Sequence, residues 1–112
     1  MNIPVVYEDD WLLVLNKLSG LLTIPTPKKE PRTLTSILNE DLKSKGLSYR
    51  LYPCHRLDRE TSGLIIYAKS KSVQQKMTDE FRHRRIKKVY LAFVQGKLGK
   101  GQGYIRYSIE GK

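Results

Sequence analysis

Short apolar runs of four to six residues recur along the chain, and they constrain its fold more than any other feature. The first two are separated only by Asp9-Asp10-Trp11 and indicate a short hairpin or two adjacent strands. Because the runs alternate irregularly with helical stretches, we expect an α+β fold with a mixed, largely antiparallel sheet and two helices. The predicted strands cover residues 5–8, 12–16, 21–24, 64–68, 89–94 and 104–109.

Two stretches have the spacing of amphipathic helices. In the first, Thr33 suits an N-cap and Gly46 suits a C-cap, with Leu or Ile at positions 34, 37, 38 and 42 between them. The second is expected to begin at Ser70 and to pack an apolar stripe on the sheet while its other faces carry Lys and Arg. Three prolines between positions 25 and 31 predict a loop. The stripe consists of Val73, Met77 and Phe81.

Length and cysteine content exclude several classes of protein. The 112 residues accommodate one small domain. A single cysteine forms no intramolecular disulfide, which favours a reducing compartment, and one Cys with two His argues against a structural zinc site. The first four residues lack the features of a signal peptide, and no apolar run approaches the ~20 residues of a spanning helix. We therefore expect a soluble, cytoplasmic protein that binds neither membrane nor metal.

Positive charge is concentrated in the second half of the chain. The formal net charge is +10, from 21 Lys and Arg against 11 Asp and Glu. Residues 69–100 are strongly basic, with Asp79 and Glu80 as their only acidic residues. Such a segment attracts polyanions in a salt-dependent manner, so nucleic acid is the leading partner class. A solvated basic face that keeps a small protein soluble is the alternative.

The segment Cys54–Gly63 is the most unusual in the chain, because polar residues crowd into a loop just before a predicted strand. Asp58 lies two residues from Arg56 and next to Arg59, and nearby cations favour the ionised form that acts as nucleophile or base. Arg56 offers a planar group suited to phosphate or to stacking on a base. From these residues alone, a surface loop of ion pairs is the preferred interpretation.

Three ordered motifs resemble those of the RluA-type RNA pseudouridine synthases. The loop reads His55-Arg56-Leu57-Asp58-x-x-Thr61-Ser62-Gly63-Leu64, as in the signature of that family. Residues 7–21 resemble its first motif, although Leu18 stands where the family usually has proline, and residues 81–96 resemble its third. The later stretch Gly-Arg-x-His-Gln-Ile/Leu-Arg has no counterpart here. The resemblance thus implies that residues 1–112 are the N-terminal half of the catalytic domain, with the C-terminal half absent.

This resemblance implies an enzyme that isomerises uridines of rRNA or tRNA to pseudouridine without a metal or other cofactor. Asp58 matches the catalytic aspartate, and Tyr90 matches the tyrosine that stacks on the target uracil and assists proton removal at C5. Arg56 matches the arginine that enters the RNA and holds the nucleotide out of its stack. Candidate contacts to the RNA backbone, each of which could also be a solvated lysine, are Lys17, Lys87 and Lys88. The residues that shape the loop are His55, Thr61, Ser62 and Gly63.

Two further interpretations follow from the missing half. The chain could be a non-catalytic basic RNA-binding module derived from a truncated synthase, which would bind RNA without forming pseudouridine. Alternatively, a second chain could supply the C-terminal half, since a sheet edge at residues 104–109 would favour pairing with another chain.

Overall fold

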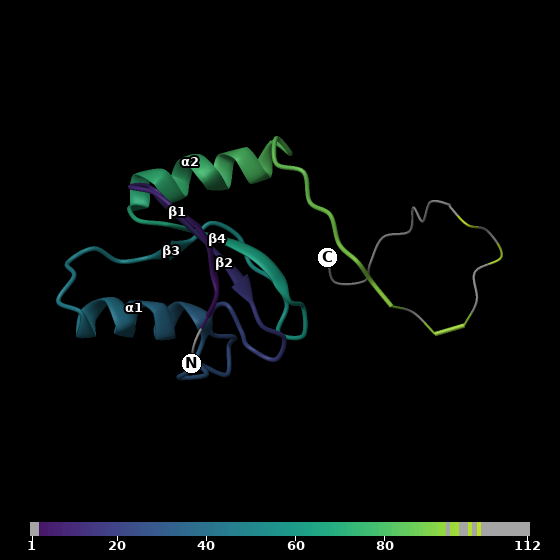
Figure 1. The fold of residues 1–112 in the computed structure, drawn as a ribbon, viewed down its shortest axis with the longest axis horizontal. Coiled ribbons are helices and arrows are strands. Elements are labelled where there is room, and N and C mark those ends of the chain that lie inside the picture. Colours follow the sequence, from purple (N-terminus) through teal and green to yellow (C-terminus); the bar gives the residue numbers. More distant parts are fainter. Residues whose placement is uncertain (1–2, 94, 97–98, 100, 102–112) are drawn as a thin grey trace.

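The computed structural model describes residues 3–93, 95–96, 99 and 101. Four strands form one sheet in the order β1-β2-β4-β3, and each pair of neighbours is antiparallel (Figure 1). Two helices complete the α+β fold expected from the sequence. Along the chain the elements are β1 (Val5–Glu8), β2 (Leu12–Lys17), α1 (Leu34–Ser44), β3 (Tyr52–Pro53), β4 (Gly63–Ala68) and α2 (Lys71–Arg82).

Strands β2 and β4 form the centre of the sheet. Their register runs from Leu12 opposite Ala68 to Lys17 opposite Gly63. Alternate side chains of both strands face α1 and form the hydrophobic core with Leu34, Leu42, Leu51 and Leu57. Figure 1 shows α1 and α2 on opposite sides of the sheet. The core residues of the two strands are Leu13, Leu15, Ile65 and Tyr67.

The predicted caps of α1 are confirmed. Thr33 accepts a hydrogen bond from the backbone N–H of Ser36 at 3.2 Å, and the Ser36 hydroxyl accepts one from the N–H of Thr33 at 2.8 Å. This capping box satisfies N–H groups that the first helical turn leaves without partners. At the other end, Gly46 follows the C-cap residue with a φ of 74°, which favours glycine.

A buried amide joins α1 to the chain before β3. Asn39 donates from Nδ2 to the carbonyl oxygens of Thr35 and Leu51, both at 3.1 Å. Its Oδ1 accepts from the N–H of Leu51 at 2.8 Å. The side chain therefore pairs with both backbone groups of Leu51 as a neighbouring strand would. Sequence patterns gave no sign of this contact.

Helix α2 begins after Ser70, as predicted, and the Ser70 side chain caps the N–H of Val73 at 3.2 Å. The apolar stripe Val73, Met77 and Phe81 is only half-buried, and no residue of α2 is fully buried. The helix contacts β4 and β3, so its predicted packing on the sheet is confirmed. No helix among the described residues is long and apolar enough to cross a membrane.

Two predicted strands are wrong. Residues 21–24 form no strand, because the carbonyl oxygens of Leu22 and Thr23 accept hydrogen bonds from the first N–H groups of α1 at 2.7 and 3.2 Å. Residues 89–93 form no strand either, since no neighbouring segment among the described residues pairs with them. Their side chains are largely exposed, with Phe93 at 93%. Residue 94 and the predicted strand at 104–109 lie outside the described residues.

Candidate functional site

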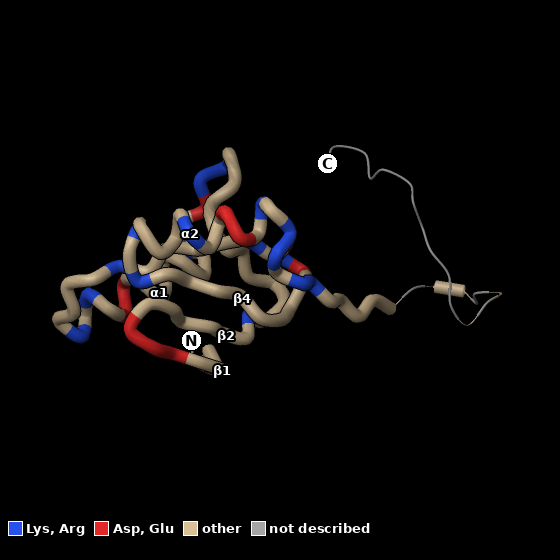
Figure 2. The backbone as a smooth tube through the Cα atoms, turned by 90° about the horizontal axis from the view of Figure 1, so that it is seen from above, with Lys and Arg blue, Asp and Glu red and all other residues tan. Residues whose placement is uncertain are grey.

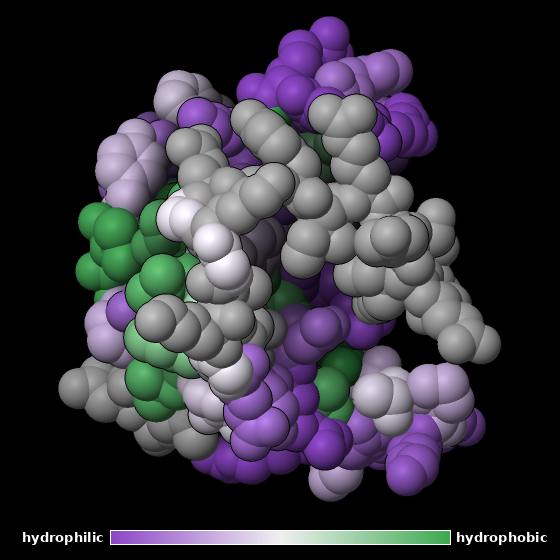
Figure 3. Space-filling model, turned by 90° about the vertical axis from the view of Figure 1, so that its right-hand side faces the viewer, coloured by the Kyte–Doolittle hydropathy of each residue, from purple (hydrophilic) through white to green (hydrophobic). Residues whose placement is uncertain are grey.

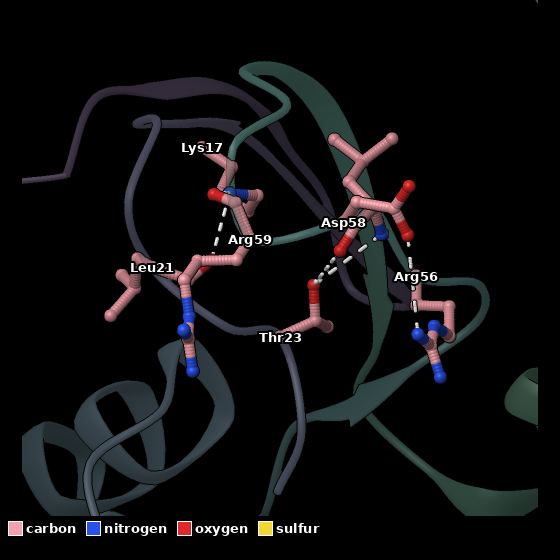
Figure 4. A network of polar contacts seen from close by, with 7 residues as sticks. Lys17, Leu21, Thr23, Arg56, Asp58 and Arg59 are labelled. Atoms are coloured by element: carbon pink, nitrogen blue, oxygen red, sulfur yellow. Dashed lines mark hydrogen bonds and ion pairs between the residues drawn. The ribbon is translucent and has the colours of Figure 1, made fainter. Parts of the chain in front are cut away.

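The loop between β3 and β4 presents Asp58 to solvent. Leu57 is buried in the core, whereas the side chains of Arg56 and Asp58 on either side are 65% and 69% exposed. Because alternate side chains of this extended segment point in opposite directions, burial of Leu57 directs its two neighbours outward. The Arg56 Nη2 atom lies 4.0 Å from the Asp58 Oδ1 atom, on the same side of the loop (Figure 4). The Asp58 carboxylate is therefore accessible, next to one guanidinium group.

Buried Thr23 fixes the backbone at this point. Its hydroxyl donates to the carbonyl oxygen of Leu57 at 3.3 Å and accepts from the N–H of Leu57 at 3.4 Å (Figure 4). The carbonyl oxygen of Asp58 itself accepts a hydrogen bond from the N–H of Thr61, three residues later, at 3.1 Å. The backbone that carries the carboxylate is thus held from both directions. No sequence motif pointed to Thr23.

Lys17 is not exposed at the protein surface, where the expected contact to the RNA backbone would place it. Its side chain is fully buried, and Nζ donates to the carbonyl oxygens of Leu18 at 2.8 Å, Leu21 at 2.8 Å and Arg59 at 3.0 Å (Figure 4). These three acceptors use all three hydrogens of the ammonium group. Burial lowers the pKa of Lys17, while the charges of Glu60 and Asp58 oppose that shift. Lys17 therefore positions the Asp58 loop.

Two further contacts hold the loop against the turn after β2. The N–H of Gly20 donates to the carbonyl oxygen of Arg59 at 2.7 Å, and the Ser19 hydroxyl donates to that of Glu60 at 2.9 Å. The Arg59 side chain extends the other way, toward Glu30, with 3.7 Å between Nη2 and Oε2. Asp58 is therefore not flanked by two guanidinium groups, as its sequence neighbours suggested; only Arg56 forms an ion pair with it among the described residues.

His55 links the loop to β4 and α2. Its Nε2 accepts the N–H of Ile66 at 3.1 Å, so a neutral ring carries its proton on Nδ1. The ring centroid lies 4.5 Å from that of Phe81, and Nδ1 is buried without a partner among the described residues. Burial lowers the pKa of His55 to about 4, and the positive charge of Lys88 adds to this shift. A neutral His55 fits the expected role in shaping the loop.

A cleft of about 880 Å³ lies between the loop, β4, the end of α2 and the extended segment that follows it. The extended segment leaves the folded part on the side of the molecule that faces the viewer in Figure 3. Hydrophilic side chains lie along the top of this view, at the level of α2. The cleft is not lined by Asp58, Arg56 or Lys17. It is lined by Leu57 and Glu60, which lie one and two positions from Asp58 in the sequence. The predicted site residues that line it are His55, Thr61, Ser62, Gly63, Lys87, Lys88 and Tyr90.

The basic and aromatic side chains of the cleft differ in their environment. Lys87 and Lys88 are both exposed, and Lys88 lies over the Phe81 ring with Nζ 5.2 Å from the ring centroid. The Tyr90 side chain is 60% exposed, so its ring is accessible for stacking. Gly63 has a φ of 135°, which favours glycine where the loop enters β4.

The described residues offer no metal site, since no three His, Cys, Asp or Glu side chains among them gather closely enough to hold an ion. Cys54 is buried, and burial raises the pKa of its thiol to about 11. The thiol therefore stays protonated at neutral pH and acts as a small apolar side chain.

Comparison with known proteins identifies the family. Residues 11–111 match the sequence model of the RNA pseudouridylate synthases. This chain belongs to that family. It is 35% identical over 103 residues to the dual-specificity RNA pseudouridine synthase RluA of Yersinia pestis, covering 90% of this chain and 47% of the relative. It is also 39% identical over 106 residues to the ribosomal large subunit pseudouridine synthase C of Rickettsia bellii, covering 95% and 34%.

The fold agrees with a solved structure of the same family. Human RNA pseudouridylate synthase domain containing 4 superimposes with a TM-score of 0.62 at 28% identity, over 73% of this chain and 30% of that one. The α+β arrangement is therefore that of the N-terminal portion of the synthase fold. The chain spans less than half the length of the curated relatives it matches.

Proposed function

We propose that this chain carries the catalytic loop of an RNA pseudouridine synthase that acts on uridines of rRNA or tRNA, with Asp58 as the catalytic carboxylate. The observation that carries the proposal is the exposed Asp58 carboxylate on a loop held by Thr23 and Lys17. A fixed backbone places the carboxylate at a defined point, and its exposure leaves room for a nucleotide. The Rickettsia relative is named for the large ribosomal subunit, which supports an RNA substrate.

The reaction is an isomerisation, so it needs no external electron or group donor. The bond between N1 of uracil and C1′ of ribose breaks, the base turns, and a bond forms between C5 and C1′. The proton on C5 is then lost, and N1 gains one. Asp58 acts either by attacking C1′ or by removing the proton on C2′ to give a glycal-like intermediate. In both routes an ionised carboxylate must reach the ribose, as the exposure of Asp58 permits.

The base must leave its stack before the carboxylate can reach the sugar. We assign Arg56 to the space that the extruded nucleotide vacates, because its guanidinium group is exposed beside Asp58. Tyr90 provides a ring for the uracil, and Lys87 provides a charge for the backbone near the same cleft. The relatives extend well beyond the matched segment, and we propose that this further part, in the same chain or in a second one, completes the site around Asp58 and Tyr90.

The decisive experiment compares two carboxylates of one loop. Asp58→Asn and Glu60→Gln each remove one negative charge from an exposed position. Each variant is incubated with cellular rRNA and tRNA, alone and with the C-terminal half of a relative, and pseudouridine is measured by mass spectrometry of nucleosides. We expect Asp58→Asn to form none while still binding RNA, and Glu60→Gln to match the wild type.

Pseudouridine formation by Asp58→Asn at the wild-type rate would contradict the proposed role of Asp58. If the wild-type chain bound RNA but formed no pseudouridine even with the complementing half, an RNA-binding module without catalysis would replace the proposed function.

A further inference from the structure

Arg84 has a backbone conformation that is strained for an arginine. Its φ is 57°, in the left-handed region that favours glycine because a Cβ there crowds the following carbonyl oxygen. It follows the C-cap residue His83 of α2, and its N–H donates to the carbonyl oxygen of Phe81 at 3.1 Å. The N–H of Arg85 donates to the carbonyl oxygen of Glu80 at 2.9 Å. The two hydrogen bonds form the helix end that usually contains glycine at the position of Arg84.

The fold gains little from an arginine at this position. Positive charge near the C-terminus of a helix is favourable, but Arg82 and Arg85 already supply it. These two arginines also have carboxylate partners, Asp79 and Glu80. Arg84, between them, is exposed and forms neither an ion pair nor a side-chain hydrogen bond with any described residue. Strain without a structural gain points to a functional reason for the side chain.

Arg84 stands at the start of a basic path that leads to the cleft. Lys87 and Lys88 follow it within four residues and line the cleft beside Tyr90. Figure 2 shows Lys and Arg positions where the chain leaves the folded part toward the extended segment. The planar guanidinium group forms paired hydrogen bonds with a phosphate, which a solvated lysine does not.

We propose that Arg84 binds a phosphate of the RNA backbone outside the catalytic loop, and that the strained conformation is retained for this contact. The inference rests on the proposed function, since it takes RNA to be the ligand. It adds a binding residue at the end of α2 that neither the loop nor the extended segment supplies.

Lys29 offers a matched control. It is the other non-glycine residue with a positive φ among the described residues, at 56°, and it lies exposed in the loop before α1. Arg84→Gly and Lys29→Gly therefore relieve the same kind of strain and remove the same charge from different places. Binding is measured by fluorescence anisotropy with a labelled uridine-containing RNA hairpin over a series of salt concentrations, and thermal unfolding is followed for each variant.

We expect both variants to unfold at a higher temperature than the wild type. Arg84→Gly should bind the hairpin roughly 3- to 10-fold more weakly and lower the slope of log affinity against log salt by about one phosphate contact, whereas Lys29→Gly should keep the wild-type slope. Equal losses of affinity in the two variants, or wild-type binding by Arg84→Gly, would overturn the inference and leave the proposed function standing. A lower unfolding temperature for Arg84→Gly would overturn the strain argument. A wild-type chain that binds no RNA would overturn the proposed function as well.

Discussion

The ammonium group of Lys17 lies 3.0 Å from the carbonyl oxygen of Arg59, directly after Asp58 in the chain. A buried charge at the end of β2 thereby fixes the loop that carries the candidate catalytic carboxylate, across 42 positions of sequence. Lys17, which a sequence motif suggests as an RNA contact, instead determines the position of the loop.

Replacing this lysine should destabilise the whole domain. Lys17→Met keeps much of the side-chain volume but removes a hydrogen-bond donor from three carbonyl oxygens, of which only that of Arg59 keeps another among the described residues, the N–H of Gly20. We therefore expect the free energy of unfolding to fall by about 3 kcal/mol or more. Urea unfolding measures the loss. Lys76→Met, at an exposed position of α2, serves as the control and should change stability by less than about 0.5 kcal/mol. Similar stabilities for the two variants would show that Lys17 is not buried in this way.

The buried amide of Asn39 should not tolerate a carboxylate. In Asn39→Asp the side chain loses both donated hydrogen bonds and faces the carbonyl oxygens of Thr35 and Leu51 with a negative charge. We expect a loss of about 2–4 kcal/mol in unfolding free energy. Asn16→Asp makes the same chemical change at an exposed position of β2 and should be nearly neutral. Amide hydrogen exchange at Leu51 should also accelerate in Asn39→Asp, and unchanged exchange there would count against the contact.

His55 should make stability depend on pH below neutrality. Its pKa is about 4 in the folded protein against 6.5 ordinarily, so the unfolded chain binds the proton more tightly. Stability from this group is therefore complete above pH 6.5 and declines as the pH falls toward 4. Between pH 7 and 4.5 the wild type should lose about 2 kcal/mol more unfolding free energy than His55→Gln, which cannot titrate. An identical pH dependence for both proteins would indicate a solvated His55.

Tyr90 should contribute to RNA binding through its ring and not through its hydroxyl. On the proposed function, Tyr90→Ala removes a stacking surface and should weaken RNA binding by about 1–3 kcal/mol, while Tyr90→Phe should bind as the wild type does. Fluorescence anisotropy with a uridine-containing RNA distinguishes them. Val89→Ala, at a neighbouring side chain that is 80% exposed, controls for changes in the extended segment. Equal binding by Tyr90→Ala and the wild type would remove Tyr90 from the site.

Local patterns predicted the regular elements well. The capping residues Thr33 and Ser70 and the left-handed Gly46 each act within one or two turns of chain, so their neighbours in sequence are also their neighbours in space. The hairpin of β1 and β2 follows the same logic. Residues 89–93 have the composition of a strand but do not form one, because a strand also needs a neighbouring strand for its backbone hydrogen bonds.

The sequence by itself therefore determined the α+β class, the two helices and the family, since these depend on local composition and on ordered motifs. Only the tertiary structure decided the environment of the site: the burial of Lys17, the Thr23 contact with Leu57, and the tilted contact of the His55 ring with Phe81. The contacts of Lys17 with Arg59, of Thr23 with Leu57 and of His55 with Phe81 each join residues more than 20 positions apart. The motif around a lysine is the same whether its ammonium group contacts water or backbone carbonyl oxygens. The path of the surrounding chain decides whether the ammonium group is solvated or buried, and the packing of the whole domain determines that path.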